Sequence, residues 1–312
     1  MDFTPVYIAS FPLDSFVDFD LFIKQELNRF VLYRSKELPF TFEARERLLY
    51  NKIDCLYIQN SDKRKYQHFV ETNLTSIIAD PNIASPKKAN ILYQASASMM
   101  EELLEKPELG NIERSASVAK GTVEYLLQGR QSFFNLLTFS MHDYYTYSHS
   151  VHVCTYAVAL AQTLGITESR MLNELATGAL LHDIGKSHVP QEIIQKKGPL
   201  TGEEMEEMKK HPDYGLHIAE TTDIISPLAK FPIIQHQEKI DGTGYPNGLA
   251  GDEIHIYGRI TAIADVFDAM TTNRSYQKAQ NFYDTLKFLV NQRSSHLDMK
   301  LLMEFVKLLG DR

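Results

Sequence analysis

The chain has 312 residues, 44% of them hydrophobic and 23% charged, which is enough for two ordinary globular domains. A net charge of −8 excludes a binder of duplex nucleic acid, which needs a basic face. Cys55 and Cys154 lie far apart in the sequence, so no disulfide framework is expected. The N-terminus does not read as a signal peptide, and no window approaches the roughly 18 apolar residues of a membrane span. We therefore expect a cytoplasmic protein without membrane insertion.

Residues 1–80 are expected to form a small α+β domain with a regulatory or partner-binding role. The predicted strands are 19–23, 30–33 and 55–58, with a turn near Leu27 and Asn28. Thr41 is a candidate cap for a first helix, and a second helix is expected to begin at Ser61 or Asp62. Two prolines and several small residues in the segment 80–86 then end the domain.

Beyond this boundary the pattern of apolar residues is helical. Residues 81–130 are expected to be connecting helices, and residues 131–312 to form a helical domain with six or seven helices after Phe133 and almost no strand. The segment 241–251 contains four glycines and a proline, which predicts a long loop and a plausible substrate lid. Residues 1–130 are expected to hold the surface for a protein partner or a homodimer.

The segment Leu180-Leu181-His182-Asp183-Ile184-Gly185-Lys186 is the most informative part of the sequence. It ends a predicted helix with one apolar face, which places His182 and Asp183 at a buried helix end. Adjacent helical residues diverge by about 100°, so the imidazole and the carboxylate can reach one metal ion. A carboxylate buried in such a place is costly unless it is paired or bound to a metal. The pair is therefore a candidate metal site.

Other segments carry isolated histidines and aspartates in the order typical of a two-metal hydrolase. The candidate ligands are His149, His182, Asp183, His211, His236 and Asp265. A lone histidine on an apolar helix face is better explained as a core residue bonded to a carbonyl, but the ordered series favours ligands. His152 and His217 are expected to be structural or surface residues. Gln237 is expected to hydrogen-bond behind the ligands, and Asp268 to orient a ligand or cap a buried polar group.

Four imidazoles and two carboxylates suit a pair of borderline transition metals better than Mg²⁺ or Ca²⁺, which prefer oxygen-rich shells. Two divalent ions are expected, with Fe favoured, Mn next, and Zn, Ni or Co as further options. Asp183 is expected to bridge them and to help generate a metal-activated hydroxide, so the expected reaction is phosphodiester cleavage. Lys186 is either a surface charge or a cation near the attacked phosphate.

From about residue 130 to 290 the sequence resembles the HD-GYP subgroup of HD-domain phosphohydrolases, which degrade cyclic di-GMP. The segments that carry the resemblance are YTYSHS at 145–150, HDIGK at 182–186, HP at 211–212, HQEKIDGTGYPNGL at 236–249, ADVFDAMT at 264–271 and RSY at 274–276. The resemblance implies an all-α HD-type helical bundle, two or three metal ions, and hydrolysis of cyclic di-GMP to the linear dinucleotide or to GMP. It also implies that Lys186 contacts the phosphate, that Arg274 binds phosphate or guanine, and that Tyr245 lies in the lid.

Three positions depart from the HD-GYP pattern. Gln237 follows His236 where the family has a second histidine, Tyr144 stands where an acidic residue is common, and Gln277 stands near a usual basic residue. The first two changes remove ligands for a third metal, and the last removes a positive contact to the substrate. Two alternatives stay open: a weak or degenerate protein that binds cyclic di-GMP as a signalling scaffold, and an HD-type hydrolase of deoxynucleotides or guanosine tetraphosphate. The Gly-Tyr-Pro loop counts against the second.

Overall fold

The computed structural model describes residues 2–25, 29–140, 146–221, 225–272 and 280–310. The chain divides into two compact units, Met1–Ala95 and Ser96–Arg312. The boundary between them falls inside helix α3 (Ser85–Glu105). The expected division at residues 80 and 130 stays a prediction. Among the described residues, no helix combines the length and the apolar character that a membrane crossing requires.

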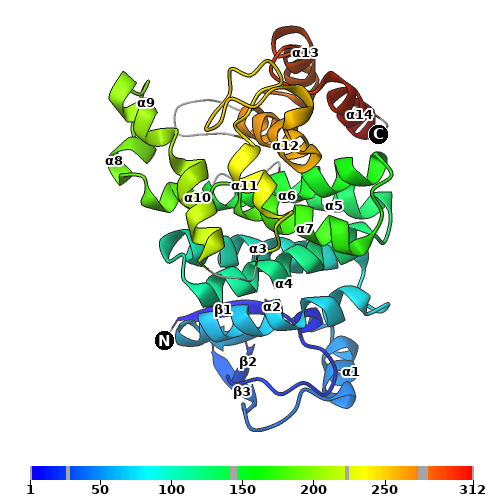
Figure 1. Ribbon diagram of the computed structural model, residues 1–312. Coiled ribbons are helices and arrows are strands. Elements are labelled where there is room, and N and C mark those ends of the chain that lie inside the picture. The colour runs from blue at the N-terminus through cyan, green and yellow to red at the C-terminus, as the bar shows by residue number, and fades with distance from the viewer. Residues whose placement is uncertain (1, 26–28, 141–145, 222–224, 273–279, 311–312) are drawn as a thin grey trace. The chain divides into compact units, whose positions relative to one another are not determined.

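The first unit contains an antiparallel sheet of four strands in the order β1-β4-β2-β3 (Figure 1). The strands are β1 (Phe3–Tyr7), β2 (Leu21–Lys24), β3 (Phe30–Arg34) and β4 (Cys55–Gln59), and the helices are α1 (Phe42–Tyr50) and α2 (Lys63–Ala79). All three predicted strands are confirmed to within a few residues. The predicted cap is confirmed as well, because the Thr41 hydroxyl accepts the N–H of Ala44 at 3.3 Å. The predicted turn at Leu27 and Asn28 lies outside the described residues.

Strand β1 is missing from the sequence-based prediction. Pro5 lies in its middle, opposite Tyr57 of β4. Proline has no N–H for a ladder hydrogen bond, so a proline inside an apolar run argues against a strand. Here β1 is an edge strand that pairs with β4 alone, and an edge position tolerates the missing donor.

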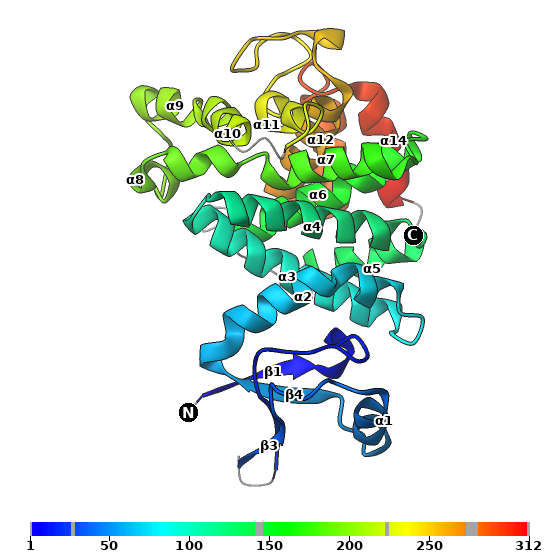
Figure 2. The same cartoon turned by 60° about the horizontal axis from the view of Figure 1, so that its bottom comes forward.

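The core of the first unit lies between this sheet and α2. Fully buried side chains of the sheet and its flanking segments include Phe11, Leu21 and Leu56, and Tyr66 and Phe69 of α2 pack against them. Figure 2 shows α2 lying along the sheet. The helix begins where predicted, with Asp62 as its N-cap residue.

The second unit is helical. Its helices are α4 (Leu109–Leu126), α5 (Arg130–Ser140), α6 (Thr146–Thr163), α7 (Ser169–Leu181), α8 (Gln191–Ile194), α9 (Gly202–Met208), α10 (His211–Glu220), α11 (Lys230–Gln235), α12 (Ile256–Thr271), α13 (Phe282–Gln292) and α14 (Met299–Gly310), with short 3₁₀ helices η4 (Ile184–His188) and η5 (Gly251–Glu253). The described residues after α5 thus form nine α-helices, so the expected six or seven is wrong. The additional helices include α8, whose four residues are too few to show an apolar stripe. Helix α9 is confirmed, because Thr201 and Glu204 form the capping box that their spacing predicts at its start.

Helix α6 is central to this unit because it packs against α5, α7, α12 and α14 (Figures 1 and 2). The buried ring of Tyr156 on α6 lies edge-on to Phe267 of α12 at 5.3 Å and to Phe305 of α14 at 5.8 Å. Helix α11 packs against both α7 and α12. These contacts bring the C-terminal end of α7 and the end of α11 next to the inner faces of α6 and α12.

Candidate metal centre

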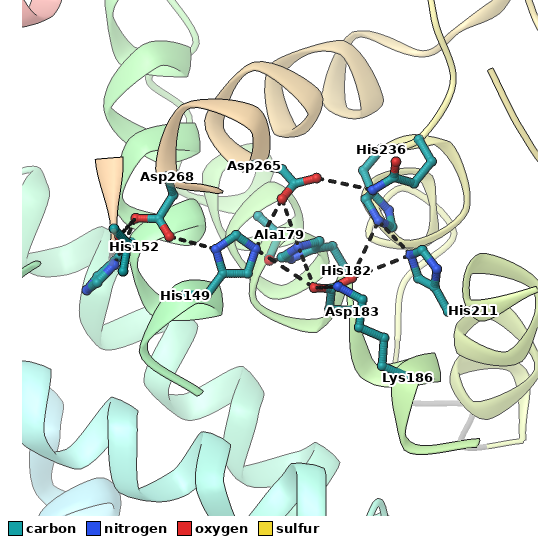
Figure 3. Close-up of polar contacts among 12 residues, drawn as sticks. His149, His152, Ala179, His182, Asp183, Lys186, His211, His236, Asp265 and Asp268 are labelled. Atoms are coloured by element: carbon teal, nitrogen blue, oxygen red, sulfur yellow. Dashed lines mark hydrogen bonds and ion pairs between the residues drawn. The ribbon is translucent and has the colours of Figure 1, made fainter. Parts of the chain in front are cut away.

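All six candidate ligands lie together in the second unit (Figure 3). His149 is on α6, and His182 and Asp183 directly follow α7. His211 is the first residue of α10, His236 follows α11, and Asp265 is on α12. The chain therefore brings residues from five separate segments to one place, and five of the six are buried.

Three of the histidines have their ring orientation set by the backbone just before them. The Nδ1 atoms of His182 and His211 each lie 2.8 Å from the carbonyl oxygen three residues earlier, those of Ala179 and Met208. His236 Nδ1 lies 3.0 Å from the Pro232 carbonyl. A carbonyl oxygen only accepts, so Nδ1 must carry the proton, and each Nε2 presents a lone pair to the centre.

His149 is oriented by a carboxylate instead. Its Nδ1 donates to Asp268 Oδ2 at 2.6 Å, and the other oxygen of Asp268 lies 2.9 Å from Nδ1 of His152. Both Asp268 and His152 are buried. Asp268 therefore bonds a buried polar group, as predicted, and that His149 is a ligand stays a prediction. His152 is a buried residue held by the same carboxylate.

The two oxygens of Asp183 face different histidines. Oδ2 lies 3.4 Å from His182 Nε2 and 3.8 Å from His149 Nε2. Oδ1 lies 3.4 Å from His211 Nε2 and 3.7 Å from His236 Nε2. Two groups that could each hold a metal ion therefore share Asp183, one with His149 and His182 and one with His211 and His236.

The donor atoms at this centre fit a cation. Nε2 of His182 and of His149 and Oδ1 of Asp183 are buried without a hydrogen-bond partner, although His149 Nε2 lies at ion-pair distance, 3.1 Å, from Asp265 Oδ1. Nε2 of His211 lies 3.1 Å from Nε2 of His236, so two lone pairs face each other. Buried polar atoms are normally paired, and a bound cation supplies the missing partner.

Protonation states agree with this fit for most of the centre. Burial lowers the pKa of His182 and lowers the pKa of His211 to about 3, so both rings are neutral, as ligands must be. Burial alone raises the pKa of Asp183, but the positive charge of Lys186 outweighs it and holds that pKa well below its ordinary value. His149 differs. Burial opposes its protonation, yet the carboxylates of Asp265 and Asp268 beside its two ring nitrogens raise its pKa to about 9.

Gly185 allows η4 to approach α10. A Cβ atom at this position would collide with the carbonyl oxygen of His211 and with the backbone of Gly215. The close contact places His211 beside Asp183. The next residue, Lys186, lies at the edge of the centre, with its ammonium 2.5 Å from Asp183 Oδ2.

Gln237 is placed as predicted, behind the candidate ligands. Its side-chain amide donates to Asp265 Oδ2 at 3.2 Å, which leaves Asp265 Oδ1 facing His149. His217 is exposed on α10 and takes no part in the centre. The prediction for each residue is confirmed.

The loop 241–251 borders the centre through Tyr245, whose ring lies 6.2 Å from that of His211. Burial and the charges of Asp183 and Asp265 raise the pKa of the Tyr245 phenol, so it stays protonated. Glu238 holds the loop in place, because its buried carboxylate accepts the N–H groups of Asn247 at 2.8 Å and Leu249 at 3.1 Å. Sequence reasoning missed Glu238, although a carboxylate directly before a Gly-rich loop was an available signal.

Arg274, the predicted phosphate or guanine contact, lies outside the described residues, as do Tyr144 and Gln277. Nothing in the structure places these side chains. Their roles stay predictions.

Comparison with known proteins agrees with this geometry. Residues 131–301 match a family model described as "HD domain". The chain is 36% identical over 185 residues to a cyclic di-GMP phosphodiesterase of Pseudomonas aeruginosa, covering 59% of this chain and 44% of that protein. It is 40% identical over 157 residues to a 3′3′-cGAMP-specific phosphodiesterase of Vibrio cholerae, covering 50% of this chain and 30% of that protein. The chain thus spans less than half of the length of either relative.

One solved structure matches almost the whole chain. It is that of Bd1817 from Bdellovibrio bacteriovorus, described as an HDG"Y"P protein. The TM-score is 0.69, the sequence identity is 24%, and the match covers 99% of this chain and 100% of that one. The predicted fold class, a small α+β domain followed by an all-α HD-type bundle, is confirmed.

Proposed function

Since this chain belongs to the HD domain family, we propose that it is a metal-dependent phosphodiesterase that hydrolyses cyclic di-GMP. The similarity to cyclic di-GMP phosphodiesterases supports the substrate class. The cluster of imidazoles and carboxylates supports metal dependence. Residues 131–301, which match the family model, contain all six candidate ligands.

The observation that carries the proposal is the position of Asp183 between two pairs of histidines. We propose that Asp183 bridges two divalent ions. His149, His182, His211, His236 and Asp265 would supply the other protein ligands. Mixed imidazole and carboxylate donors favour transition metals, with Fe first, Mn next, and Zn, Ni or Co as further options. When bound, such ions lower the pKa of water and neutralise phosphate oxygens.

The remaining residues would position the substrate. The Lys186 ammonium already lies at the edge of the centre, and its partly exposed side chain can reach a phosphate oxygen. Tyr245 keeps its phenolic proton and can donate it to a phosphate or a guanine. Arg274 is proposed as a further phosphate or guanine contact on the basis of the sequence pattern alone.

A second candidate substrate is 3′3′-cGAMP, because a relative of comparable identity carries that specificity in its name. A third candidate function is a cyclic di-GMP-binding scaffold with little turnover. This function is favoured by Gln237, which stands where the HD-GYP pattern has a second histidine. Its amide hydrogen-bonds to Asp265 and offers no imidazole for a metal ion. These candidates differ in product and rate, not in the location of the site.

The test is elemental analysis of anaerobically purified protein alongside turnover assays with cyclic di-GMP and 3′3′-cGAMP. We expect two metal ions per chain and a linear dinucleotide or GMP as product. Tight nucleotide binding without product, with Fe or Mn bound, would favour the scaffold. Faster hydrolysis of 3′3′-cGAMP than of cyclic di-GMP would reassign the substrate.

A further inference from the structure

A cavity of about 180 Å³ lies beside the candidate metal centre and shares His236 and Gln237 with it. Ala262 and Val266 of α12 form part of its wall. Three basic side chains line the cavity: Lys239, Arg293 and His296. Neither the proposed reaction nor the predicted ligand set uses any of the three.

The two permanent charges of this cavity have no acidic partner. Among the described residues, neither the Lys239 ammonium nor the Arg293 guanidinium forms an ion pair with a carboxylate. Both side chains are half-buried. Arg293 instead lies over the ring of Phe288, 5.9 Å from its centre. Two cations that lack a carboxylate partner form a local positive field in a chain whose net charge is −8.

The nearby carboxylates are already satisfied by other groups. Glu238 accepts two N–H groups of the loop 241–251, as described above. Asp298 pairs with Arg259 at 3.0 Å. Asp241 is exposed at the rim, where it accepts hydrogen bonds from Thr243 and lies 3.8 Å from His296 Nε2. Of these carboxylates only Glu238 lines the cavity, so its walls carry two cations against one carboxylate and are positive on balance.

His296 adds a neutral donor. Arg293 Nη1 donates to His296 Nδ1 at 3.1 Å, so the ring proton of the neutral imidazole is on Nε2. Burial and the charge of Lys239 lower the pKa of His296, while Asp241 opposes this change. The cavity thus combines a guanidinium, an ammonium and one neutral N–H donor.

We propose that this cavity binds a phosphate group of a nucleotide or of inorganic phosphate. The planar fork of Arg293 suits two phosphate oxygens, and Lys239 suits a third as a point charge. If the phosphate is the second phosphate of a cyclic dinucleotide, the proposal rests on the proposed function. A separate phosphate ligand needs no such link.

The test is calorimetric titration of inorganic phosphate into the full chain, both as purified and after removal of metal by a chelator. We expect saturable binding in both forms. Lys239→Gln and Arg293→Gln should each weaken it by about tenfold or more, the usual cost of losing one charge-assisted contact. Arg293→Lys, which keeps the positive charge, should weaken phosphate binding less than Arg293→Gln does. Lys300→Gln, an exposed lysine outside the cavity, is the matched control and should leave binding unchanged.

Absence of saturable binding at millimolar phosphate would overturn the proposal, and so would equal affinity in all variants. Circular dichroism and the melting temperature verify that each variant is folded. The calorimetry needs no turnover, so it decides the proposal even if cyclic di-GMP is not hydrolysed.

Kinetics with metal-loaded protein then identify the source of the phosphate. If it belongs to the substrate, Lys239→Gln should raise KM for cyclic di-GMP by about tenfold with kcat nearly unchanged. If it belongs to a separate ligand, KM should stay constant while the calorimetric binding is lost. Both outcomes support an anion site and differ only in what fills it.

Discussion

His211 and His236 face each other through Nε2 atoms 3.1 Å apart, although the other ring nitrogen of each donates to a backbone carbonyl. Two lone pairs at this distance repel each other, and neither ring can rotate without losing its carbonyl hydrogen bond. A cation between the rings would turn the repulsion into two favourable contacts. The two Nε2 atoms are therefore placed to share one cation.

Metal binding should therefore raise stability. At a metal concentration about 1,000 times Kd, a ligand that binds only the folded state adds about 4 kcal/mol. We expect the melting temperature to fall when Fe or Mn is removed by a chelator and to recover when it is restored, as followed by calorimetry. His217→Ala, an exposed histidine on the same helix as His211, should keep the full shift. A melting temperature that stays the same when the metal is removed and restored would contradict the assignment of the centre.

Asp183→Asn should remove metal binding at both halves of the centre, because each oxygen of Asp183 faces a different pair of histidines. An amide presents one neutral oxygen and a nitrogen that repels a cation. We expect metal content to fall well below two ions per chain and turnover to fall by at least about 10²-fold. Mass spectrometry of the metals and a product assay provide the two measurements. Asp213→Asn, an exposed carboxylate on α10, is the control and should change neither.

Metal affinity should rise with pH up to about 9. Asp265 and Asp268 outweigh burial and raise the pKa of His149 to about 9 in the metal-free protein, so a proton occupies this ring at neutral pH and must leave when metal binds. Titration of metal in buffers of different ionisation enthalpy should show about one proton released at pH 7 from this ring. Asp268→Asn should reduce that release. A pH-independent affinity between pH 7 and 9 would argue against His149 as a ligand.

The same raised pKa gives the metal-free protein the opposite pH dependence. Because the folded-state pKa of His149 lies above 6.5, the ordinary pKa of a histidine, protonation of His149 stabilises the metal-free fold. That contribution is fully present below pH 6.5 and is lost as pH rises through about 9. Chemical unfolding of the chelator-treated protein at pH 6.5 and 9.5 measures it. Asp268→Asn removes one of the charges that raise the pKa of His149, so it should reduce the difference between the unfolding midpoints at pH 6.5 and pH 9.5.

Gly185→Ala should destabilise the protein and weaken metal binding together. The added methyl would meet the His211 carbonyl and the Gly215 backbone, neither of which is a flexible side chain. Overpacking of this kind costs about 1–3 kcal/mol and would push α10, with His211, away from Asp183. Urea unfolding and a metal titration test both effects. Gly110→Ala in α4 is the matched control, because no atom lies within 4 Å of the added Cβ. If Gly185→Ala behaves like Gly110→Ala, the close approach is not needed.

Much of the local structure could be predicted from the sequence, because its signals span only a few residues. Thr41 caps α1 as predicted, because its hydroxyl needs only a backbone N–H three residues later. Strand β1 was not predicted because Pro5 lacks the N–H that a strand interior needs. The strand tolerates Pro5 only because it lies at the edge of the sheet. That position depends on the pairing with β4, more than 50 residues later in the chain.

The sequence by itself determined which side chains could form the centre, since isolated histidines and aspartates in a fixed order are a chemical pattern that needs no coordinates. Even the ring orientation of His182 and His211 follows from carbonyls three residues earlier. The tertiary structure decided the rest: which oxygen of Asp183 faces which histidines, that Asp268 joins His149 to His152, and that Lys239 meets Arg293 and His296 in one cavity. The reason is physical. These contacts join segments far apart in the chain, and helix packing, not local sequence, sets the distances between them.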